Sequence, residues 1–135
     1  MTYEVTKPDE QWRTELSAEE FAVLRQAATE RPWTGELLDE KRLGTYRCRA
    51  CSAVLFQAET KFDSHCGWPS FYAPGADDAV ELIEDRSLGM VRTEVRCARC
   101  GSHLGHLFDD APQTPTGDRY CMNSVSLTFD PQDGR

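Results

Sequence analysis

The stretch Arg119-Tyr120-Cys121-Met122-Asn123-Ser124-Val125-Ser126-Leu127-Thr128-Phe129 decides how this chain is expected to fold. Its odd-numbered positions share one face of an extended strand, because successive side chains of a strand point to opposite sides. That face is apolar at one end and carries Arg119, Cys121 and Asn123 at the other. We predict a strand over residues 120–129 that leaves a core and ends in a polar pocket. A buried, unreactive thiol is the alternative interpretation of Cys121.

The composition is that of one domain, residues 1–135, in a soluble globular protein. Hydrophobic residues make up 39% and charged residues 28% of the chain, which is ordinary for this class. The formal net charge of −8 argues against nucleic acid or an anionic membrane as a partner. We find neither a signal peptide nor an apolar run of the roughly 18 residues that span a membrane. We therefore expect a cytoplasmic monomer with reduced thiols; three disulfides would need an oxidising compartment.

A helical segment at about residues 8–30 precedes a β core at about residues 44–130. Pro8 suits the first turn of a short helix. Ser17 and Glu20 fit a capping box, and apolar residues at helical spacing predict a helix over 18–29. Short pieces broken by Gly, Pro and Asp then predict strands over 44–48, 53–56, 80–84, 90–97, 103–108 and 120–129. The expected fold is mainly β and mostly antiparallel.

Strand 90–97 alternates between an apolar and a charged face. Val91 and Val95 lie on one face, whereas Arg92, Glu94 and Arg96 lie on the other. This pattern predicts a sheet with one face in water. Residues 85–89 have the length of a hairpin connection. We assign the indoles of Trp12 and Trp33 to packing.

Two Cys-x-x-Cys pairs predict a metal site. Two intervening residues let a tight turn aim both sulfurs at one ion, and Gly101 relieves the backbone after the second pair. Because 45 residues separate the pairs, against roughly 15–20 in compact zinc modules, one structural Zn²⁺ would clip distant strands together. A thioredoxin-type redox pair would need a βαβ context, which neither pair has. The predicted ligands are Cys48, Cys51, Cys97 and Cys100.

Cys66 and Cys121 are left outside these pairs. Cys66 stands in Asp63-Ser64-His65-Cys66-Gly67-Trp68-Pro69-Ser70-Phe71-Tyr72, a loop of the kind that carries binding residues. Trp68 and Phe71 are either core aromatics or a wall for a small apolar group. A second free thiol can condense with an oxidised first one.

Two of the three histidines, His103 and His106, are three residues apart. On a flat strand they would point to opposite faces, but Gly101 and Gly105 permit a bend or bulge that brings both toward one pocket. Because four thiolates already complete the coordination of the predicted Zn²⁺, these imidazoles have no obvious metal to bind. A role in acid–base catalysis or hydrogen bonding is therefore favoured for them. An imidazole and the Arg119 guanidinium near a thiol would lower its pKa.

Three motifs resemble the methionine-R-sulfoxide reductases of the B type. They are Cys66-Gly67-Trp68-Pro69-Ser70-Phe71, Gly101-Ser102-His103-Leu104-Gly105-His106-Leu107-Phe108-Asp109-Asp110 and Arg119-Tyr120-Cys121-Met122-Asn123-Ser124. They occur in the family's order, with the two cysteine pairs interleaved as in its zinc-containing members. The similarity covers about residues 7–130. It implies two small, barrel-like antiparallel sheets with N-terminal helices, and zinc on the side away from the active site.

The resemblance also implies a reaction on the R epimer of methionine sulfoxide, protein-bound or free. Cys121 would attack the sulfoxide sulfur and become a sulfenic acid. Cys66 would resolve it as a disulfide, which thioredoxin reduces. Many relatives have Thr at the position of Cys66. Gly is expected more often than His65, which is either a solvated loop residue or a cation that favours the Cys66 thiolate.

The physical requirements of the reaction agree with these roles. Sulfoxide oxygen leaves poorly unless it is protonated, so an acid is needed, and His103 is our first choice. His106, Asn123 and Arg119 would orient or polarise the S–O group and hold the thiolate. An aromatic wall suits the substrate's apolar ε-methyl group. The predicted substrate-binding residues are Trp68, Phe71 and Phe108.

Two alternatives from other classes stay open at this point. A non-catalytic zinc-binding interaction module of related fold has no need of two unpaired cysteines beside histidine, arginine and asparagine. A zinc hydrolase using His103 and His106 would show metal-dependent turnover that survives Cys121→Ser.

Overall fold

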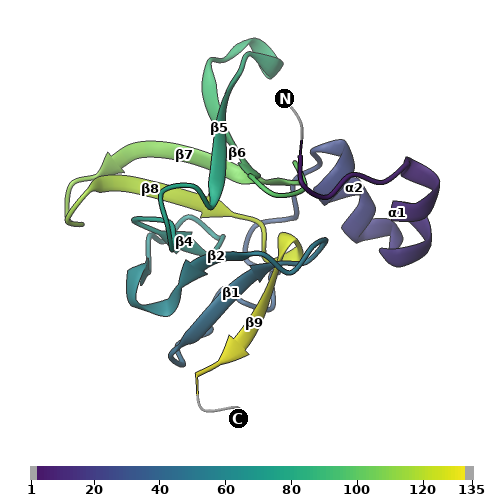
Figure 1. The fold of residues 1–135 in the computed structure, drawn as a ribbon. Helices are drawn as coiled ribbons and strands as arrows, with labels where there is room; N and C mark the ends of the chain where they lie inside the picture. Colours follow the sequence, from purple (N-terminus) through teal and green to yellow (C-terminus); the bar gives the residue numbers. More distant parts are fainter. Residues whose placement is uncertain (1–2, 133–135) are drawn as a thin grey trace.

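A computed structural model describes residues 3–132, with two short helices packed to one side of two sheets (Figure 1). The helices are α1 (Asp9–Glu15) and α2 (Ala18–Gln26). Short 3₁₀ turns occupy Ala58–Thr60, Ser87–Gly89 and Ser124–Ser126. The strands are β1 (Gly44–Cys48), β2 (Val54–Gln57), β3 (Lys61–Phe62), β4 (Ser70–Phe71), β5 (Val80–Asp85), β6 (Arg92–Cys97), β7 (His103–Ala111), β8 (Gly117–Met122) and β9 (Leu127–Pro131).

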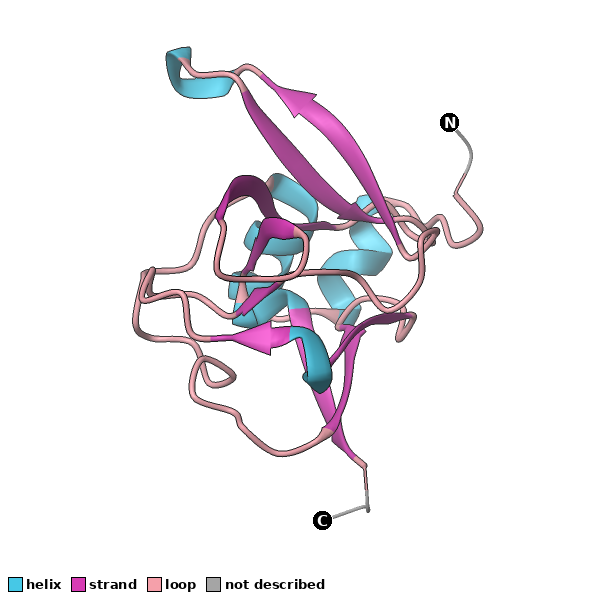
Figure 2. Ribbon diagram, turned by 90° about the vertical axis from the view of Figure 1, so that its left-hand side faces the viewer, coloured by secondary structure: helices cyan, strands magenta, loops and turns pink. Residues whose placement is uncertain are grey.

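The strands form a three-stranded sheet of order β2-β1-β9 and a six-stranded sheet of order β3-β4-β8-β7-β6-β5. Neighbouring strands in both sheets are antiparallel. The mainly β, antiparallel fold is therefore confirmed. The β5–β6 hairpin projects from the body and carries the 3₁₀ turn Ser87–Gly89 at its tip (Figure 2).

The prediction of one strand over residues 120–129 is wrong. β8 ends at Met122, and the chain crosses through the turn Ser124–Ser126 into β9 of the other sheet. The Ser126 N–H donates to the Asn123 carbonyl at 3.0 Å and closes the turn, while the backbone N–H and side-chain Nδ2 of Asn123 both donate to the Leu104 carbonyl, at 2.9 and 3.0 Å. The polar and apolar ends of the stretch therefore belong to different sheets.

The capping box of α2 is confirmed. Ser17 Oγ accepts the Glu20 N–H at 3.1 Å, and Glu20 Oε1 accepts the Ser17 N–H at 2.9 Å. The helix ends at Gln26, earlier than predicted, because Ala27 takes a left-handed conformation with φ 58°. Neither helix is long and apolar enough to cross a membrane, as judged over residues 3–132.

An aromatic cluster joins the two sheets. The ring of Phe71, from β4, stacks on Phe56 at 4.4 Å and meets the edge of Tyr46 at 5.0 Å. Burying each such ring contributes roughly 1.5–3 kcal/mol. Trp12 is also buried, as predicted, whereas Trp33 is 63% exposed and its assignment to packing is wrong.

The charged face of strand 90–97 is not fully in water. Glu94 is 7% exposed, because His103 and Arg96 both bind its carboxylate, at 2.8 and 3.0 Å. Val91, expected on the apolar face, lies before β6 and is 65% exposed. At Glu94, hydrogen bonding to His103 on the next strand and to Arg96 on its own strand therefore overrides the local alternation.

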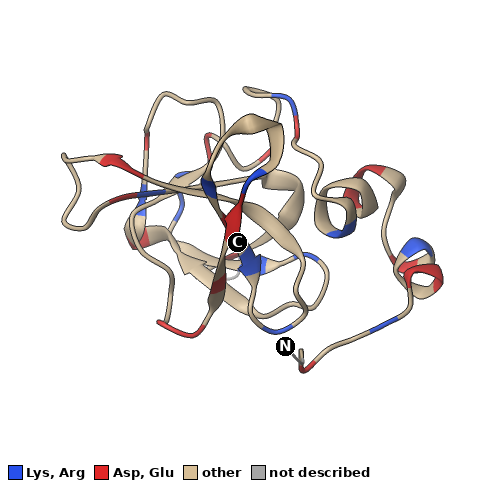
Figure 3. Ribbon diagram, turned by 90° about the horizontal axis from the view of Figure 1, so that it is seen from above, with Lys and Arg blue, Asp and Glu red and all other residues tan. Residues whose placement is uncertain are grey.

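Acidic and basic residues are interspersed along the ribbon, on the helices and on the sheets (Figure 3). Exposed pairs such as Arg47 with Asp130, at 2.6 Å, are typical of these contacts. Such surface pairs contribute about 0–1 kcal/mol each. Burial between the sheets is consequently the larger source of stability.

Gly105→Ala is predicted to destabilise the protein by roughly 3 kcal/mol, as overpacking does. A Cβ at Gly105 would strike the Cys121 carbonyl oxygen and lie 2.9 Å from Met122 Cα. Gly75→Ala is the control, since its Cβ would make ordinary contacts at 3.4 Å or more. Urea unfolding of both variants measures the difference. Equal stabilities would contradict the close approach of β7 and β8.

Candidate active site

The register of the six-stranded sheet sets the surroundings of Cys121. β8 lies between β4 and β7, so Cys121 pairs with Ser70 on one side and with His106 on the other. Side chains of directly paired residues share one face of a sheet. The thiol therefore lies between a hydroxyl and an imidazole.

The loop between β3 and β4 brings Cys66 to the same place. The Met122 N–H donates to the Pro69 carbonyl at 2.9 Å, which ties the loop to β8. Gly67 has a φ of 92°, a region that side chains rarely adopt, and the chain turns back there. The Sγ atoms of Cys66 and Cys121 lie 3.6 Å apart. The two thiols outside the Cys-x-x-Cys pairs are thus neighbours.

His65 occupies a position that suits glycine. Its φ is 59°, in the left-handed region, and its N–H donates to Asp63 Oδ1 at 3.0 Å. The side chain is 82% exposed, with Nδ1 at 3.4 Å from the Asp63 carboxylate. These contacts fit the solvated-loop interpretation of His65.

A cleft of about 90 Å³ opens over the Cys121 thiol. It brings together five of the predicted residues: Trp68, His106, Phe108, Cys121 and Asn123. The lining also includes Thr29 and Arg92, which were not predicted from the sequence, because helix periodicity and strand alternation do not indicate a role in the site for either residue. The complete lining is Thr29, Trp68, Arg92, Gly105, His106, Phe108, Cys121 and Asn123.

Four predicted site residues lie outside the lining of this cleft, and one of them is Cys66, whose thiol contacts Cys121. Phe71 belongs to the aromatic cluster of the core. His103 is 4% exposed, behind the cleft wall. Arg119 makes a two-point contact with Asp110, both distances being 2.9 Å, and its guanidinium covers the Phe108 ring at 4.4 Å.

The bulge expected near Gly105 is present. The register of β6 and β7 shifts between Val95 and Arg96, where Val95 pairs with Gly105 and Arg96 with His103. The extra residue on β7 brings the two imidazoles side by side, with ring centroids 5.5 Å apart.

Each imidazole binds a carboxylate that was not predicted from the sequence to belong to the site. His103 Nδ1 lies 2.8 Å from Glu94 Oε2, and His106 Nε2 lies 2.8 Å from Asp85 Oδ2. Burial would raise the pKa of Glu94, but hydrogen bonds from His103 and Arg96 outweigh it and lower that pKa to about 2. The pKa of His106 is lowered, chiefly by burial, against the opposing effect of Asp85.

The pKa values of the two thiols differ from expectation. The pKa of Cys66 falls to about 4, chiefly because the Cys121 thiol hydrogen-bonds to it and secondly because Ser64 does, with Oγ at 2.9 Å. The pKa of Cys121 is raised by the same sulfur contact and by burial, while Arg119 opposes the shift. Arg119 thus lowers the pKa of Cys121 as expected, but the contact with Cys66 and burial outweigh it, so the net shift is upward. The lowered pKa of Cys66 favours the thiolate form there.

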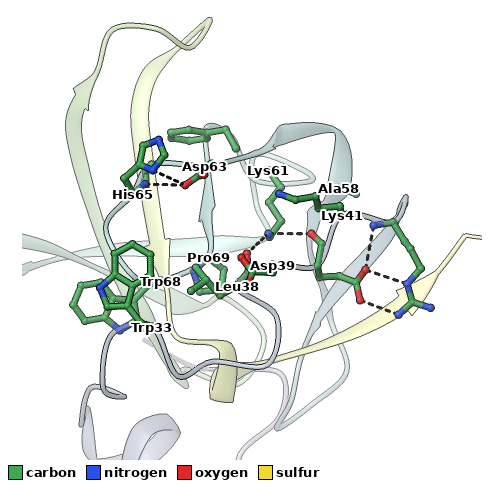
Figure 4. Close-up of a pocket in the computed structure, with 14 residues that line it drawn as sticks. Trp33, Leu38, Asp39, Lys41, Ala58, Lys61, Asp63, His65, Trp68 and Pro69 are labelled. Atoms are coloured by element: carbon green, nitrogen blue, oxygen red, sulfur yellow. Dashed lines mark hydrogen bonds and ion pairs between the residues drawn. The ribbon is translucent and has the colours of Figure 1, made fainter.

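A larger hollow of about 240 Å³ lies beside the Cys66 loop (Figure 4). Trp33 and Trp68 are close together at one side of it, and Lys61 enters from the other. The Lys61 ammonium forms intramolecular hydrogen bonds, since it donates to the carbonyls of Leu38 and Glu40 at 2.9 and 3.0 Å. Trp68 borders both this hollow and the cleft over Cys121.

The four remaining cysteines form one cluster where the sheets meet. Their Sγ atoms all lie within 4.8 Å of one another, and the shortest distances are 3.5 Å for Cys51–Cys97 and 3.7 Å for Cys48–Cys100. Tetrahedral Zn–S bonds of about 2.3 Å separate sulfurs by about 3.8 Å, so the cluster fits a metal ion. β1 and β6 end at Cys48 and Cys97, so this ion would join the two sheets.

Comparison with known proteins identifies the family. The SelR domain matches residues 16–131. "Peptide methionine sulfoxide reductase MsrB" of Leifsonia xyli is 66% identical over 97% of this chain and 94% of its own length. Proteins of the same name from Pseudomonas putida and Leptospira interrogans are 55% and 54% identical, each over 96% of this chain and 97% and 98% of their own lengths. This chain therefore belongs to the SelR-domain family, the B-type methionine-R-sulfoxide reductases, which are oxidoreductases.

Proposed function

We propose that this chain reduces the R epimer of methionine sulfoxide to methionine with a pair of thiols. The observation that carries the proposal is the 3.6 Å contact between the sulfurs of Cys66 and Cys121 beneath a cleft with an indole and an imidazole in its wall. The relatives' name, peptide methionine sulfoxide reductase, supports oxidised polypeptides as the substrate class.

In the first step, the Cys121 thiolate attacks the sulfoxide sulfur. One proton is delivered to the sulfoxide oxygen, which is transferred to Cys121 as a sulfenic acid while methionine leaves. Because contact with Cys66 and burial raise the pKa of Cys121, its proton must leave before or during the attack. The apolar face of Trp68 suits the ε-methyl group of the substrate.

His106 is the better candidate for the acid, although His103 was our first choice. His106 lines the cleft, whereas His103 is 4% exposed and bound to Glu94. Asp85 holds His106 Nε2, and the imidazole pairs with Cys121 across the strands. The other ring nitrogen would therefore take the proton that Cys121 loses and pass it to the sulfoxide oxygen. Asn123 also lines the cleft, but its amide is engaged with Glu30 and Leu104, so orienting the wall is its best-supported role.

In the second step, Cys66 attacks the sulfur of oxidised Cys121. An S–S bond forms, the S–O bond breaks, and water leaves after the oxygen is protonated. The sulfurs start 3.6 Å apart and need to approach to about 2.0 Å, so a small loop movement suffices. A dithiol protein such as thioredoxin would then restore both thiols by exchange.

A structural zinc ion completes the proposal. When bound, it would cross-link the two sheets, with no position left for substrate. Residues 3–132 contain no second group of three or more histidines, cysteines or carboxylates placed to hold a metal. The hydrolase alternative with His103 and His106 as metal ligands therefore lacks support. The non-catalytic module is disfavoured as well, because it would not need two neighbouring free thiols beside a cleft.

Cys121→Ser is expected to lower sulfoxide reduction more than roughly 10³-fold, because the nucleophile is lost. Cys66→Ser should keep a first turnover but recycle poorly with thioredoxin. Chromatographic separation of the two sulfoxide epimers, after incubation with either thioredoxin or dithiothreitol as the reductant, measures both effects. Full thioredoxin-dependent turnover by Cys66→Ser would refute the resolving role, and equal loss of both epimers would refute the proposed specificity.

Cys66 should be alkylated before Cys121 at about pH 6, because the thiolate is the reactive form and the pKa of Cys66 is lowered. In Cys66→Ser the pKa of Cys121 should fall relative to the native protein, since the sulfur contact that raises it is gone. Peptide mass spectrometry of iodoacetamide-treated protein across a pH series gives both profiles. Preferential labelling of Cys121 in the native protein would contradict this distribution of charge.

Removing zinc should lower the melting temperature by about 10 °C or more, because metal binding is coupled to folding. Cys97→Ala should have the same effect, whereas Cys66→Ala should retain zinc and melt near the native temperature. Elemental analysis together with thermal unfolding tests this. A native melting temperature in metal-free protein would refute a structural metal.

A further inference from the structure

Glu30 is a buried acid in the segment that follows α2. It is 7% exposed, although buried carboxylates are rare without a cationic partner. Its Oε1 accepts the Val125 N–H at 2.9 Å, and within residues 3–132 its Oε2 has no hydrogen-bond partner. Burial raises the pKa of this carboxyl group. Such a group is costly, so its position calls for a function.

The backbone of Glu30 holds both walls of the cleft. Its N–H donates to Asn123 Oδ1 at 3.0 Å, and its carbonyl accepts the indole N–H of Trp68 at 3.1 Å. Trp68 and Asn123 line the cleft together with Thr29, the residue before Glu30. One residue therefore contacts three separate segments: the Cys66 loop, the end of β8 and, through its carboxylate, the turn after it.

The chain closes tightly over this carboxyl group. A Cβ at Gly35 would strike Ser124 Oγ and lie 2.6 Å from Glu30 Oε2, so no larger residue fits there. The Leu37 N–H donates to the same Ser124 hydroxyl at 3.3 Å. The segment between α2 and β1 contains neither helix nor strand, so individual hydrogen bonds determine where it lies. Besides those of Glu30 and Leu37, the Trp33 N–H donates to the Gly67 carbonyl at 2.7 Å, and Lys61 binds two carbonyls farther along.

We propose that Glu30 is a positioning residue, whose carboxylate anchors the segment to Val125 so that its backbone clamps Trp68 and Asn123 on either side of Cys121. The proposal rests on the proposed sulfoxide reduction, because the clamp matters through the substrate. An indole without its hydrogen bond is free to turn about two torsions. A site of this kind must hold its groups to within about 0.5 Å, so loosening Trp68 weakens substrate binding more than it slows chemistry.

Glu30→Ala tests the clamp, with Glu36→Ala as the control from an exposed position on the same segment. Loss of one anchoring hydrogen bond is expected to raise KM for methionine sulfoxide on the order of tenfold, with a smaller change in kcat. Glu36→Ala should keep the native constants. Glu30→Gln retains an oxygen that accepts the Val125 N–H, so it should restore most of the affinity.

Indole N–H resonances provide a readout that does not need the substrate. In Glu30→Ala the Trp68 cross-peak should move as its hydrogen bond is lost, while the cross-peak of Trp12, buried among the helices, should stay in place. If Glu30→Ala does not fold, Glu30→Asp, which keeps the charge but shortens the reach, takes its place with the same expectations.

An unmoved Trp68 resonance, or a KM that rises equally in Glu36→Ala, would overturn the clamp. A fall in kcat with KM unchanged would also overturn the clamp, since it would mean that Glu30 acts in the chemical step and not in substrate binding. A native protein that leaves methionine sulfoxide unreduced would instead overturn the proposed function, and the Trp68 resonance would still report on the clamp.

Discussion

The buried turn at residues 123–126 is the constraint on which the site depends. A buried polar group must find a hydrogen-bond partner, and this turn finds its partners in two distant segments, the start of β7 and the segment between α2 and β1. Asn123 binds Leu104 and Glu30, Ser124 accepts the Leu37 N–H, and Ser126 donates to the His103 carbonyl at 3.0 Å. The turn passes the chain between the sheets and places Cys121, two residues earlier, against β7 and the Cys66 loop.

Features with a local physical cause could be predicted from the sequence. The Ser17 capping box is satisfied within four residues, and the bulge beside Gly105 follows from glycine's freedom and the spacing of the histidines. The break after Met122 could not be predicted, because the alternation of residues 119–129 continues across it and the Leu104 carbonyl that holds Asn123 is 19 residues away. The prediction that Glu94 lies on a face in water failed for the same reason, since its partner His103 lies on the next strand.

The site also combines features that are evident in the local sequence with features that depend on distant parts of the chain. Its thiols, imidazoles and Trp68 carry chemistry in their residue types, so the sequence identifies them as candidates. Their distances depend on the pairing of Ser70 with Cys121, between strands that are far apart in the chain, and β4 is only two residues long. Phe71 illustrates the limit: it follows the loop motif directly, yet strand alternation turns it into the core, away from the cleft.

A reductase with six cysteines must keep the proposed redox pair from exchanging with the other thiols. Here the sulfur contacts fall into two separate sets: Cys48 with Cys100 and Cys51 with Cys97 at the junction of the sheets, and Cys66 with Cys121 at the cleft. Exchange needs an attacking thiolate in line with a disulfide sulfur. A metal on the first set would occupy its thiolates and also fix the ends of β1 and β6. The same bonds that stabilise the fold would then leave Cys66 as the one thiol placed to resolve Cys121.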